Sequence, residues 1–324
     1  MTCSNAAVLA IGEILIDLIA SDDSTELETV SSFDVRPGGA PANAAVALSR
    51  LGVPSAFCGV AGRDPFGSKL LATLRDEGVD SSRVRQDSEL DTSLAFAWKD
   101  SRGDGHFRLM RMADSLLSPV DAENAGIEHM AAIVVGSVSL AAEPSRSAIY
   151  RAVELARQAS VPVCFDVNIR PTLWPQPDAM IKACSPLLEQ SDLIKVSIDD
   201  ARALFGPVAD GAEAVRSISR FPARFAVITD GPRGSWYAVR GGEQLVASEH
   251  IPAFSVKAID PTGAGDAFTA ATVSRLICNR WEGLSAADIV YASAAGALAT
   301  TRRGAMSSLP RQAEVQAFLR DHQA

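Results

Sequence analysis

The chain has 324 residues, of which 47% are hydrophobic and 21% are charged, and its net charge is −9. This composition is that of a globular protein with enough chain for a large core. The acidic balance argues against a protein that mainly grips nucleic acid or docks on an anionic membrane, because both need clustered lysine and arginine. It does not exclude a small anionic ligand, since a local site can hold one whatever the net charge.

The cysteines and the N-terminus bear on the compartment. The five cysteines are scattered and show no CxxC spacing, which predicts buried free thiols in a reducing compartment. They are Cys3, Cys58, Cys164, Cys184 and Cys278. The apolar N-terminus is interrupted by Glu13 and Asp17 and follows no basic region, so it predicts neither a signal peptide nor a membrane span. We therefore expect a cytoplasmic protein.

The predicted elements alternate between strand and helix along most of the chain. Short apolar runs predict buried strands at residues 7–11, 56–60, 132–136, 161–166, 193–196 and 225–229. Amphipathic or apolar stretches predict helices at residues 42–51, 67–77, 145–160, 179–190, 267–279, 286–300 and 311–322. Alternating strands and helices imply a mainly parallel sheet covered by helices on both faces, which is a three-layer α/β/α fold.

Two stretches break this alternation. Residues 14–36 and 91–112 contain strand-like segments without an intervening helix, which predicts a small β-sheet flap at the edge of the main domain. A further hairpin is expected at residues 235–246, around the turn Gly241-Gly242. No linker separates two units, so we expect residues 1–324 to form a single domain that includes the flap.

The string DPTGAGDAF at residues 260–268 is the most informative part of the sequence. It follows a β-like segment at 251–259 and opens a long apolar helix. Gly263 and Gly265 permit tight or left-handed turns, so successive N–H groups can point at one place. At a helix N-terminus such groups form a phosphate cradle, here without a lysine. Asp266, in the first turn, is placed to take the proton of an attacking hydroxyl. Read alone, a glycine turn and an N-cap aspartate also explain the string.

Polar residues also follow other glycine turns and strands. Asp17 follows an apolar strand, either as a ligand group or as a surface residue. Asn43 lies just inside a predicted helix after a Gly-Gly turn, and its amide offers both a donor and an acceptor, unless it faces solvent. Arg170 comes just past a buried strand, where α/β proteins bind ligands. It meets either a ligand or the neighbouring Asp166.

Together these strings resemble the signatures of the ribokinase-like (PfkB) carbohydrate kinases, most closely those of fructokinases. The matching strings are GEILID at 12–17, GGAPANAAVAL at 38–48, VAGRDPFG at 60–67, DVNIRPTLWP at 166–175, KVSIDD at 195–200, ITDGPRG at 228–234, the GAGD string and TTRRGA at 300–305. Pro261 and Val167 depart from the usual Thr and Pro. The resemblance spans nearly the whole chain and implies a ribokinase-like fold in which the flap is a lid.

The resemblance implies ATP-dependent phosphorylation of a sugar. Asp266 would be the catalytic base, and the amides of Gly263, Ala264 and Gly265 would form the anion hole. The lid arginines Arg108 and Arg111 would face the sugar, unless they belong to a solvated face of the flap. The other sugar-binding residues would be Asp17, Gly38, Gly39, Asn43, Asn168 and Arg170.

The resemblance also implies sites for ATP and for metal ions. The expected nucleotide-binding residues are Lys195, Ser197, Thr229, Gly231, Gly234, Gly263, Gly265 and Gly304. Asp200 stands where the family has the glutamate of a Mg²⁺-associated Asn-x-x-Glu motif, although Ser197 and Asp200 also read as a capping box. A monovalent cation such as K⁺ would lie among Asp260, Thr262, Gly304 and Ser308.

Other enzyme signatures are missing from the sequence. It contains no P-loop, no dinucleotide-binding GxGxxG after a strand, and no GxSxG nucleophile elbow, and its four histidines have no metal-ligand spacing. The GGAPAN and DVNIRPTLW strings look most like those of fructokinases, and this resemblance implies a kinase that phosphorylates D-fructose at O6. Its expected partners are a sugar and ATP, and neither nucleic acid nor membrane. The resemblance also implies a homodimer that pairs through the lid.

Other functions stay open at this point. An arginine that holds a carboxylate would indicate a 2-keto-3-deoxygluconate kinase. A ribose or nucleoside kinase is a further alternative, and so is a non-catalytic sugar or nucleotide sensor on the same fold.

Overall fold

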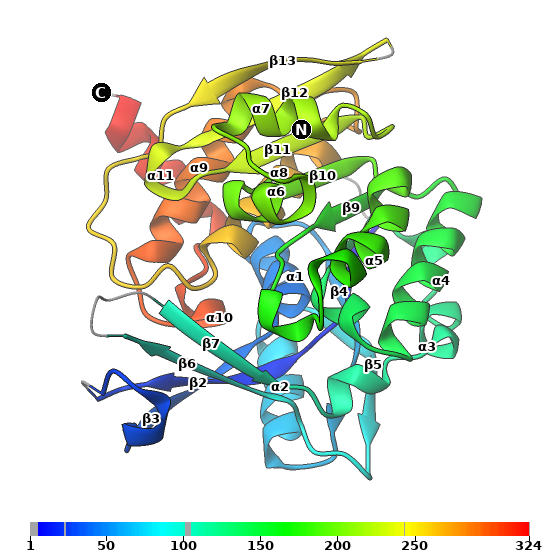
Figure 1. Cartoon of the computed structure of the whole chain (residues 1–324), viewed down its shortest axis with the longest axis vertical. Coiled ribbons are helices and arrows are strands. Elements are labelled where there is room, and N and C mark those ends of the chain that lie inside the picture. The colour runs from blue at the N-terminus through cyan, green and yellow to red at the C-terminus, as the bar shows by residue number, and fades with distance from the viewer. Residues whose placement is uncertain (1–5, 23, 101–104, 243, 324) are drawn as a thin grey trace.

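The computed structural model describes residues 6–22, 24–100, 105–242 and 244–323 (Figure 1). A nine-stranded sheet has the order β13-β12-β11-β10-β9-β8-β1-β4-β5. Neighbours from β5 to β11 pair in parallel, whereas β12 and β13 at the other edge are antiparallel. The strands are β1 (Val8–Ile11), β4 (Ser55–Gly62), β5 (Asp80–Asp87), β8 (Ala132–Gly136), β9 (Val163–Asp166), β10 (Leu193–Ser197), β11 (Phe225–Thr229), β12 (Ser235–Gly241) and β13 (Gln244–Ile251).

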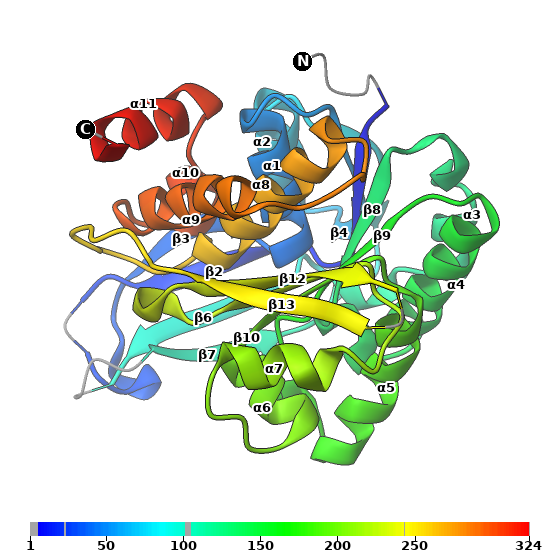
Figure 2. The ribbon, with the colours of Figure 1, turned by 90° about the horizontal axis from the view of Figure 1, so that it is seen from above.

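Helices cover both faces of this sheet and make three layers, as Figure 2 shows. One face carries α1 (Ala40–Arg50), α2 (Pro65–Asp76), α8 (Ala264–Cys278), α9 (Ala286–Thr300) and α11 (Gln312–Gln323), with the short α10 (Ala305–Ser308) beside them. The other carries α3 (Pro119–Glu123), α4 (Ser145–Gln158), α5 (Pro177–Gln190), α6 (Ile198–Phe205) and α7 (Gly211–Ile218). In β1, Leu9 and Ile11 enter one hydrophobic cluster and Val8 and Ala10 the other, because successive strand residues point to opposite faces.

A second sheet of four strands lies beside the main one. It has the order β3-β2-β6-β7 and consists of β2 (Leu15–Ala20), β3 (Phe33–Gly38), β6 (Leu94–Lys99) and β7 (Gly105–Met110). The strand β2 follows β1 after three residues, and β3 runs into α1, so the small sheet is rooted at the carboxyl ends of the main strands. The expected small β-sheet within residues 14–36 and 91–112 is thereby confirmed.

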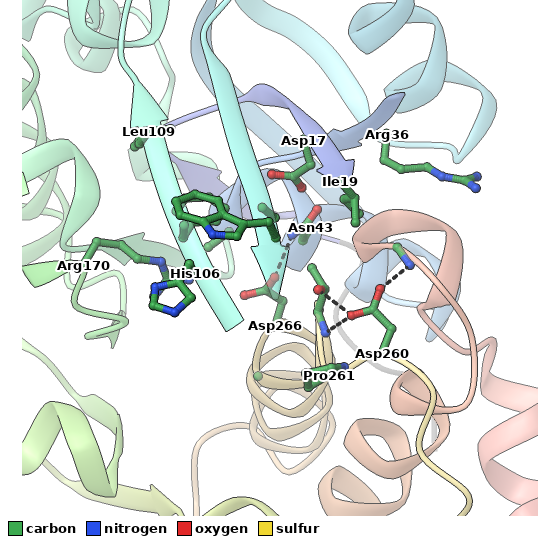
Figure 3. Close-up of a pocket in the computed structure, with 18 of the residues that line it drawn as sticks. Asp17, Ile19, Arg36, Asn43, His106, Leu109, Arg170, Asp260, Pro261 and Asp266 are labelled. Carbon is green, nitrogen blue, oxygen red and sulfur yellow. Dashed lines mark hydrogen bonds between the residues drawn. The ribbon is translucent and has the colours of Figure 1, made fainter. Parts of the chain in front are cut away.

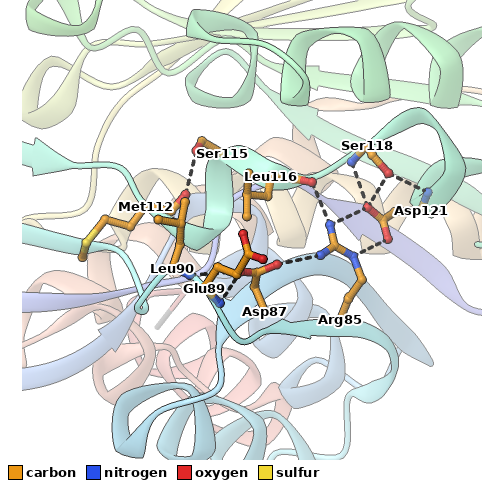
Figure 4. A network of polar contacts seen from close by, with 9 residues as sticks. All are labelled: Arg85, Asp87, Glu89, Leu90, Met112, Ser115, Leu116, Ser118 and Asp121. Atoms are coloured by element: carbon orange, nitrogen blue, oxygen red, sulfur yellow. Dashed lines mark hydrogen bonds and ion pairs between the residues drawn. The ribbon is translucent and has the colours of Figure 1, made fainter.

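A polar network holds the chain where it leaves the main sheet for β6 (Figure 4). Arg85 on β5 donates to the Asp121 carboxylate at 2.9 Å and to the Leu116 carbonyl at 2.8 Å. Asp87, at the end of β5, accepts from the Leu90 N–H at 3.0 Å. These bonds connect β5, the turn before β6 and the segment after β7. They fix both ends of the β6–β7 hairpin to the main body.

Most predicted elements agree with the structure, but one predicted strand is wrong, and β5, α3 and α7 were not predicted. The strand expected at 251–259 is wrong, because β13 ends at Ile251 and the following chain is irregular. Pro252 lacks a donor for a sheet, and the N–H of Ile259 bonds to the Thr300 carbonyl on α9 instead. The strand β5 escaped prediction because its sequence, DSSRVRQD, is polar, as suits the edge of a sheet.

The cysteines agree with expectation in part. Cys58, Cys164 and Cys184 are buried free thiols. Cys278 is disulfide-bonded, so the expectation of a free thiol is wrong at that position. Within the described residues, no helix is both long enough and apolar enough to cross a bilayer.

Candidate active site

A cavity of about 1170 Å³ lies between the small sheet and the main sheet (Figure 3). One wall comes from β2, β3, β6 and β7 of the small sheet. The opposite wall comes from the residues that follow β9, β10 and β11 and from the start of α8. This is the edge where parallel strands end and where open α/β sheets bind ligands.

The start of α8 forms the floor of the cavity. Gly263, the N-cap residue, has the left-handed φ of 81°, and a Cβ there would lie 3.1 Å from the Ala305 carbonyl oxygen, so the turn needs glycine. The N–H of Ala264 bonds to the Pro261 carbonyl at 3.1 Å, so it is taken up within the turn. Within the described residues, the N–H groups of Gly263 and Gly265 have no hydrogen-bond partner. These two amides can therefore receive an anion at the positive end of the helix.

Asp266 is buried in the first turn of α8 and faces the cavity. Asn43, on α1, donates from its Nδ2 to Asp266 Oδ2 at 2.7 Å. Burial and, after it, the nearby Asp166 carboxylate raise the pKa of Asp266 to about 6 against the opposing effects of Asn43, Lys195 and Arg170. A carboxylate with a pKa just below neutrality is still mostly ionised at pH 7 and is a stronger base than an exposed aspartate.

A second buried carboxyl group, Asp17, lies at the end of the cavity formed by β2. Burial and, after it, the Asp266 carboxylate raise the pKa of Asp17 to about 7, although the Arg170 guanidinium opposes the rise. Gly38 pairs with Leu15 across β2 and β3, and a Cβ on Gly38 would overlap the Asp17 carboxylate. Gly38 itself does not line the cavity, so its contribution is to leave room for Asp17.

Asn43 has an acceptor to spare. Its Oδ1 is buried and has no hydrogen-bond partner within the described residues. A buried amide oxygen without a partner is costly, and a hydroxyl of a bound molecule would satisfy it. Asn43 and Asp17 together give this end of the cavity the donors and acceptors that a polyhydroxy ligand requires.

Arg170 and Asn168 extend the cavity wall beyond β9. Arg170 Nη1 donates to Asn168 Oδ1 at 2.7 Å, and its guanidinium lies 5.6 Å from the centre of the Phe107 ring on β7. Asn168 has a left-handed φ of 44°. Arg170 therefore makes contacts on the cavity wall and not with Asp166, which was the other expectation for it.

A lysine reaches the phosphate cradle from a neighbouring strand. Lys195 on β10 is buried, and its Nζ would lie 3.4 Å from a Cβ placed on Gly265. Its Nζ donates to Asp166 Oδ1 at 3.0 Å. Although burial disfavours the charged ammonium, the carboxylates of Asp166, Asp200 and Asp266 raise the pKa of Lys195 overall. The GAGD string contains no lysine, but the fold brings one to it.

Asp200 has a local structural function. Its Oδ2 accepts from the N–H and the Oγ of Ser197 at 2.8 and 2.7 Å, which makes a capping box at the start of α6. Its Oδ1 accepts from the Ile169 N–H at 2.8 Å. With both oxygens used in this way, Asp200 does not fit as a direct ligand of Mg²⁺. Within the described residues, no cluster of three His, Cys, Asp or Glu side chains can hold a metal ion.

The proposed monovalent-cation residues meet at the other end of the α8 turn. Asp260 accepts from the Thr262 Oγ1 at 2.6 Å and from the Gly304 N–H at 2.9 Å. The Ser308 Oγ donates to the Ala305 carbonyl at 2.9 Å and lies 3.5 Å from the Thr262 carbonyl oxygen. These bonds tie the turn before α8 to the turn before α10.

Besides Gly38, two expected sugar-binding residues, Arg108 and Arg111, do not line the cavity, which is a correction. Phe107 and Leu109 on β7 face the cavity, so strand alternation turns Arg108 to the exposed outer face. Arg111 lies beyond the end of the strand, and its guanidinium is buried against Asp114 at 2.7 Å and against the Val138 carbonyl at 3.0 Å. The Arg111 guanidinium, which we expected to bind the sugar, therefore pairs with the buried Asp114 carboxylate instead.

The structure thus separates the expected site residues into two groups. The first group lines one cavity and consists of Asp17, Gly39, Asn43, Asn168, Arg170, Lys195, Ser197, Asp200, Thr229, Asp260, Thr262, Gly263, Gly265, Asp266 and Gly304. The second group does not line it and consists of Gly38, Arg108, Arg111, Gly231, Gly234, Ala264 and Ser308.

Some cavity residues were not singled out from the sequence. Glu13 is buried, accepts from the Ala40 N–H at 3.2 Å, and has a pKa that burial raises to about 7. Trp98 and His106 on the small sheet stack with ring centres 5.4 Å apart. Glu13 stands inside the GEILID string and was open to prediction. The aromatic pair was not, because only the pairing of β6 with β7 brings the two rings together.

A glycine-built helix start, a buried carboxylate and a lysine meet at the carboxyl edge of a parallel sheet. This combination defines a phosphotransferase of the ribokinase-like fold class. Residues 5–312 match the model of the pfkB family of carbohydrate kinases, so the chain belongs to this family.

Individual relatives agree with this assignment. Fructokinase-1 of Zea mays is 36% identical over 321 residues, which cover 97% of this chain and 98% of the relative. A fructokinase from Vibrio cholerae O395, solved with fructose, ADP and a calcium ion, is 31% identical with a TM-score of 0.84, over 97% of this chain and 99% of that one. A putative ribokinase II from E. coli, solved with ATP and Mg²⁺, is 27% identical with a TM-score of 0.87, over 98% and 100% of the two chains.

Proposed function

We propose that this protein is an ATP-dependent fructokinase that converts D-fructose to fructose 6-phosphate. The observation that carries the proposal is the buried Asp266 at the start of α8, bonded to Asn43 and facing the cavity beside the amides of Gly263 and Gly265. The fructokinase relatives at about one-third identity over nearly the full chain support the choice of sugar.

The proposed chemistry moves one phosphoryl group and one proton. The O6 oxygen of fructose forms a bond to the γ-phosphorus, the bond from that phosphorus to the β–γ bridging oxygen breaks, and Asp266 takes the O6 proton. Asn43 would orient Asp266 and accept a second sugar hydroxyl at its unpartnered Oδ1. Asp17 would hold a further hydroxyl. The amides of Gly263 and Gly265 would stabilise the negative charge on the transferring phosphoryl group.

The nucleotide would lie on the opposite side of the α8 turn. Ser197 and Thr229, at the ends of β10 and β11, and Gly304 line this part of the cavity. Mg²⁺ bound with ATP would supply positive charge at the phosphates. The lack of a carboxylate cluster among the described residues suits an ion held mainly by phosphates and water. A double mutant of the V. cholerae fructokinase has been solved with fructose, ADP and a potassium ion. We propose K⁺ beside Asp260 and Thr262.

The small sheet would act as a lid within a single domain. It forms one wall of the cavity, and closure over the sugar would exclude water that otherwise hydrolyses ATP. Its outer side carries exposed apolar residues, Val35 and Met110, on its two edge strands. Pairing of two copies through this sheet, and a cytoplasmic location, stay predictions.

The alternative acceptor with a carboxylate, 2-keto-3-deoxygluconate, loses its main support. That alternative rested on a lid arginine facing the sugar, and neither Arg108 nor Arg111 lines the cavity. Arg170 does line the cavity, so 2-keto-3-deoxygluconate is included among the substrates to be tested.

The experiment is a coupled assay of ADP release with fructose, 2-keto-3-deoxygluconate, ribose and a nucleoside. We expect kcat/KM to be highest for fructose. Turnover with another member of the panel alone would contradict the choice of sugar, and ATP binding without any turnover would indicate a sensor.

A further inference from the structure

Asp166 is a buried carboxylate that the proposed reaction does not use directly. It ends β9 and accepts two hydrogen bonds, one on each oxygen. Lys195 donates to Oδ1 at 3.0 Å from β10, and the Thr269 hydroxyl donates to Oδ2 at 2.6 Å from α8. The side chains of Asp166 and Lys195 are 10% and 7% exposed, so solvent screens this pair little.

The partners of Asp166 place it behind the phosphate cradle. Lys195 Nζ lies beside Gly265, and Thr269 stands three residues after Asp266, on the same side of α8. Asp166 therefore ties the ammonium to the helix that presents both the amides and the base. The ammonium, the amides and the base can then hold a fixed spacing while the small sheet moves.

The hydrogen bonds also separate the two carboxylates by function. Lys195 has three buried aspartates within electrostatic reach, Asp166, Asp200 and Asp266. Its hydrogen bond and ion pair go to Asp166, whereas Asp266 is bonded to Asn43 and Asp200 to Ser197 and Ile169. An ammonium bonded directly to Asp266 would lower the pKa of that carboxylate and occupy one of its oxygens, which would weaken it as a base. The pairing of Lys195 with Asp166 therefore keeps Asp266 available for the sugar hydroxyl.

We propose that Asp166 is a positioning residue for phosphoryl transfer, which holds the Lys195 ammonium against the transferring phosphate and away from Asp266. This inference rests on the proposed function as a sugar kinase, but not on which sugar is phosphorylated. Lys195 then supplies, from β10, the cation that the GAGD string lacks.

Asp166→Asn and Lys195→Gln test the proposal because they remove opposite charges near Asp266. The other charged groups that face Asp266, Asp17 and Arg170, are left in place. Both variants should lower kcat at least about tenfold, with little change in KM for the sugar. The acid limb of kcat against pH should move to lower pH in Asp166→Asn and to higher pH in Lys195→Gln, by roughly half a unit or more. A purely structural defect gives no such opposite shifts.

A milder pair of variants guards against loss of folding. Thr269→Val removes one hydrogen bond to Asp166. Thr272→Val removes a buried hydroxyl of the same helix that, among the described residues, bonds only to the Phe268 carbonyl, at 2.9 Å. We expect kcat to fall about threefold or more in Thr269→Val and to stay within about twofold in Thr272→Val. Equal effects of the two, or an unchanged kcat in Lys195→Gln, would overturn the proposal.

The assay uses whichever sugar the wild-type enzyme phosphorylates, so a wrong choice of fructose leaves this test intact. If no sugar is turned over, the proposed function fails on its own. Calorimetry with Mg·ATP then decides the inference. Lys195→Gln should weaken ATP binding about fivefold or more, while Lys182→Gln, at an exposed position on α5, should not. Equal affinities of the two variants would refute it.

Discussion

Two buried ion pairs lie close to the cavity, and they behave differently. Lys195 and Asp166 meet at 3.0 Å, and the ammonium lies on the cavity wall. Arg111 and Asp114 meet at 2.7 Å, and the guanidinium donates its remaining bonds to the Val138 carbonyl and to Ser145. The Lys195 ammonium keeps N–H donors that a ligand could accept from, whereas the Arg111 guanidinium donates to groups inside the protein. Burial and charge alone therefore do not mark a functional residue; the direction of the remaining donors does.

The largest expected effect is on kcat and concerns Asp266, which faces the cavity near the Lys195–Asp166 pair. Asp266→Ala should lower kcat by about 10²–10⁴-fold, because it removes the general base. Affinity for ATP should change far less, since the amides of Gly263 and Gly265 remain. Steady-state kinetics together with ATP titration measure both. A variant with near wild-type kcat would exclude Asp266 as the base.

The next effect falls on the second ion pair and concerns stability. Arg111→Met should lower the free energy of unfolding by about 3–5 kcal/mol, because it leaves the Asp114 carboxylate buried without its cation. Asp114 also accepts a hydrogen bond from the buried Ser93 hydroxyl, so the loss of Arg111 also disturbs the hydrogen bond of this second buried group. Urea unfolding measures the change. If Arg111→Met is as stable as wild type but has a strongly raised KM for fructose, Arg111 binds the sugar after all.

The pH dependence of turnover gives a smaller effect. Since the pKa of Asp266 is raised to about 6 in the protein without substrate, kcat/KM should rise about tenfold per pH unit below 6 and level off above 7. The same raised pKa has the opposite sign for stability. The folded protein keeps a proton that the unfolded chain loses near pH 4, so this contribution to stability declines as pH rises through about 6. A pH series of kcat/KM and of Tm checks both signs. A kcat/KM that is flat from pH 5 to 8 would contradict the first.

The smallest effect is expected at Arg108, which serves as the control for Arg111. Arg108→Ala should change the KM for the sugar by less than about twofold and the free energy of unfolding by less than about 0.5 kcal/mol. The reason is that the side chain is exposed on the outer face of β7. A large rise in KM would show that the small sheet turns this face inward when it closes.

Much of the fold and of the site was open to prediction from the sequence. Apolar runs and amphipathic periods predicted the central strands and the main helices, because burial on one or both faces imposes those patterns. The GAGD, GGAPAN and DVNIR strings predicted Asp266, Asn43 and Arg170, since short-range turns and helix starts are encoded locally.

What escaped prediction depends on contacts between distant segments. The sequence shows arginine and aspartate in RMAD at 111–114, but not that Asp114 faces the protein interior and captures Arg111. It shows Asp166, Lys195 and Thr269 in three separate strings, but not that two adjacent strands and α8 bring them into contact. The free amide of Ala264 was wrongly expected, because the turn closes its N–H onto Pro261.

The central claim is that Asp266 takes the proton of the 6-hydroxyl of fructose. Phosphorus NMR of wild type and Asp266→Asn, incubated with fructose and Mg·ATP at equal enzyme concentration, tests it most directly. We predict fructose 6-phosphate from the wild type and no product above background from Asp266→Asn over the same period. Comparable fructose 6-phosphate from Asp266→Asn, or phosphorylation by the wild type at another oxygen, would contradict it.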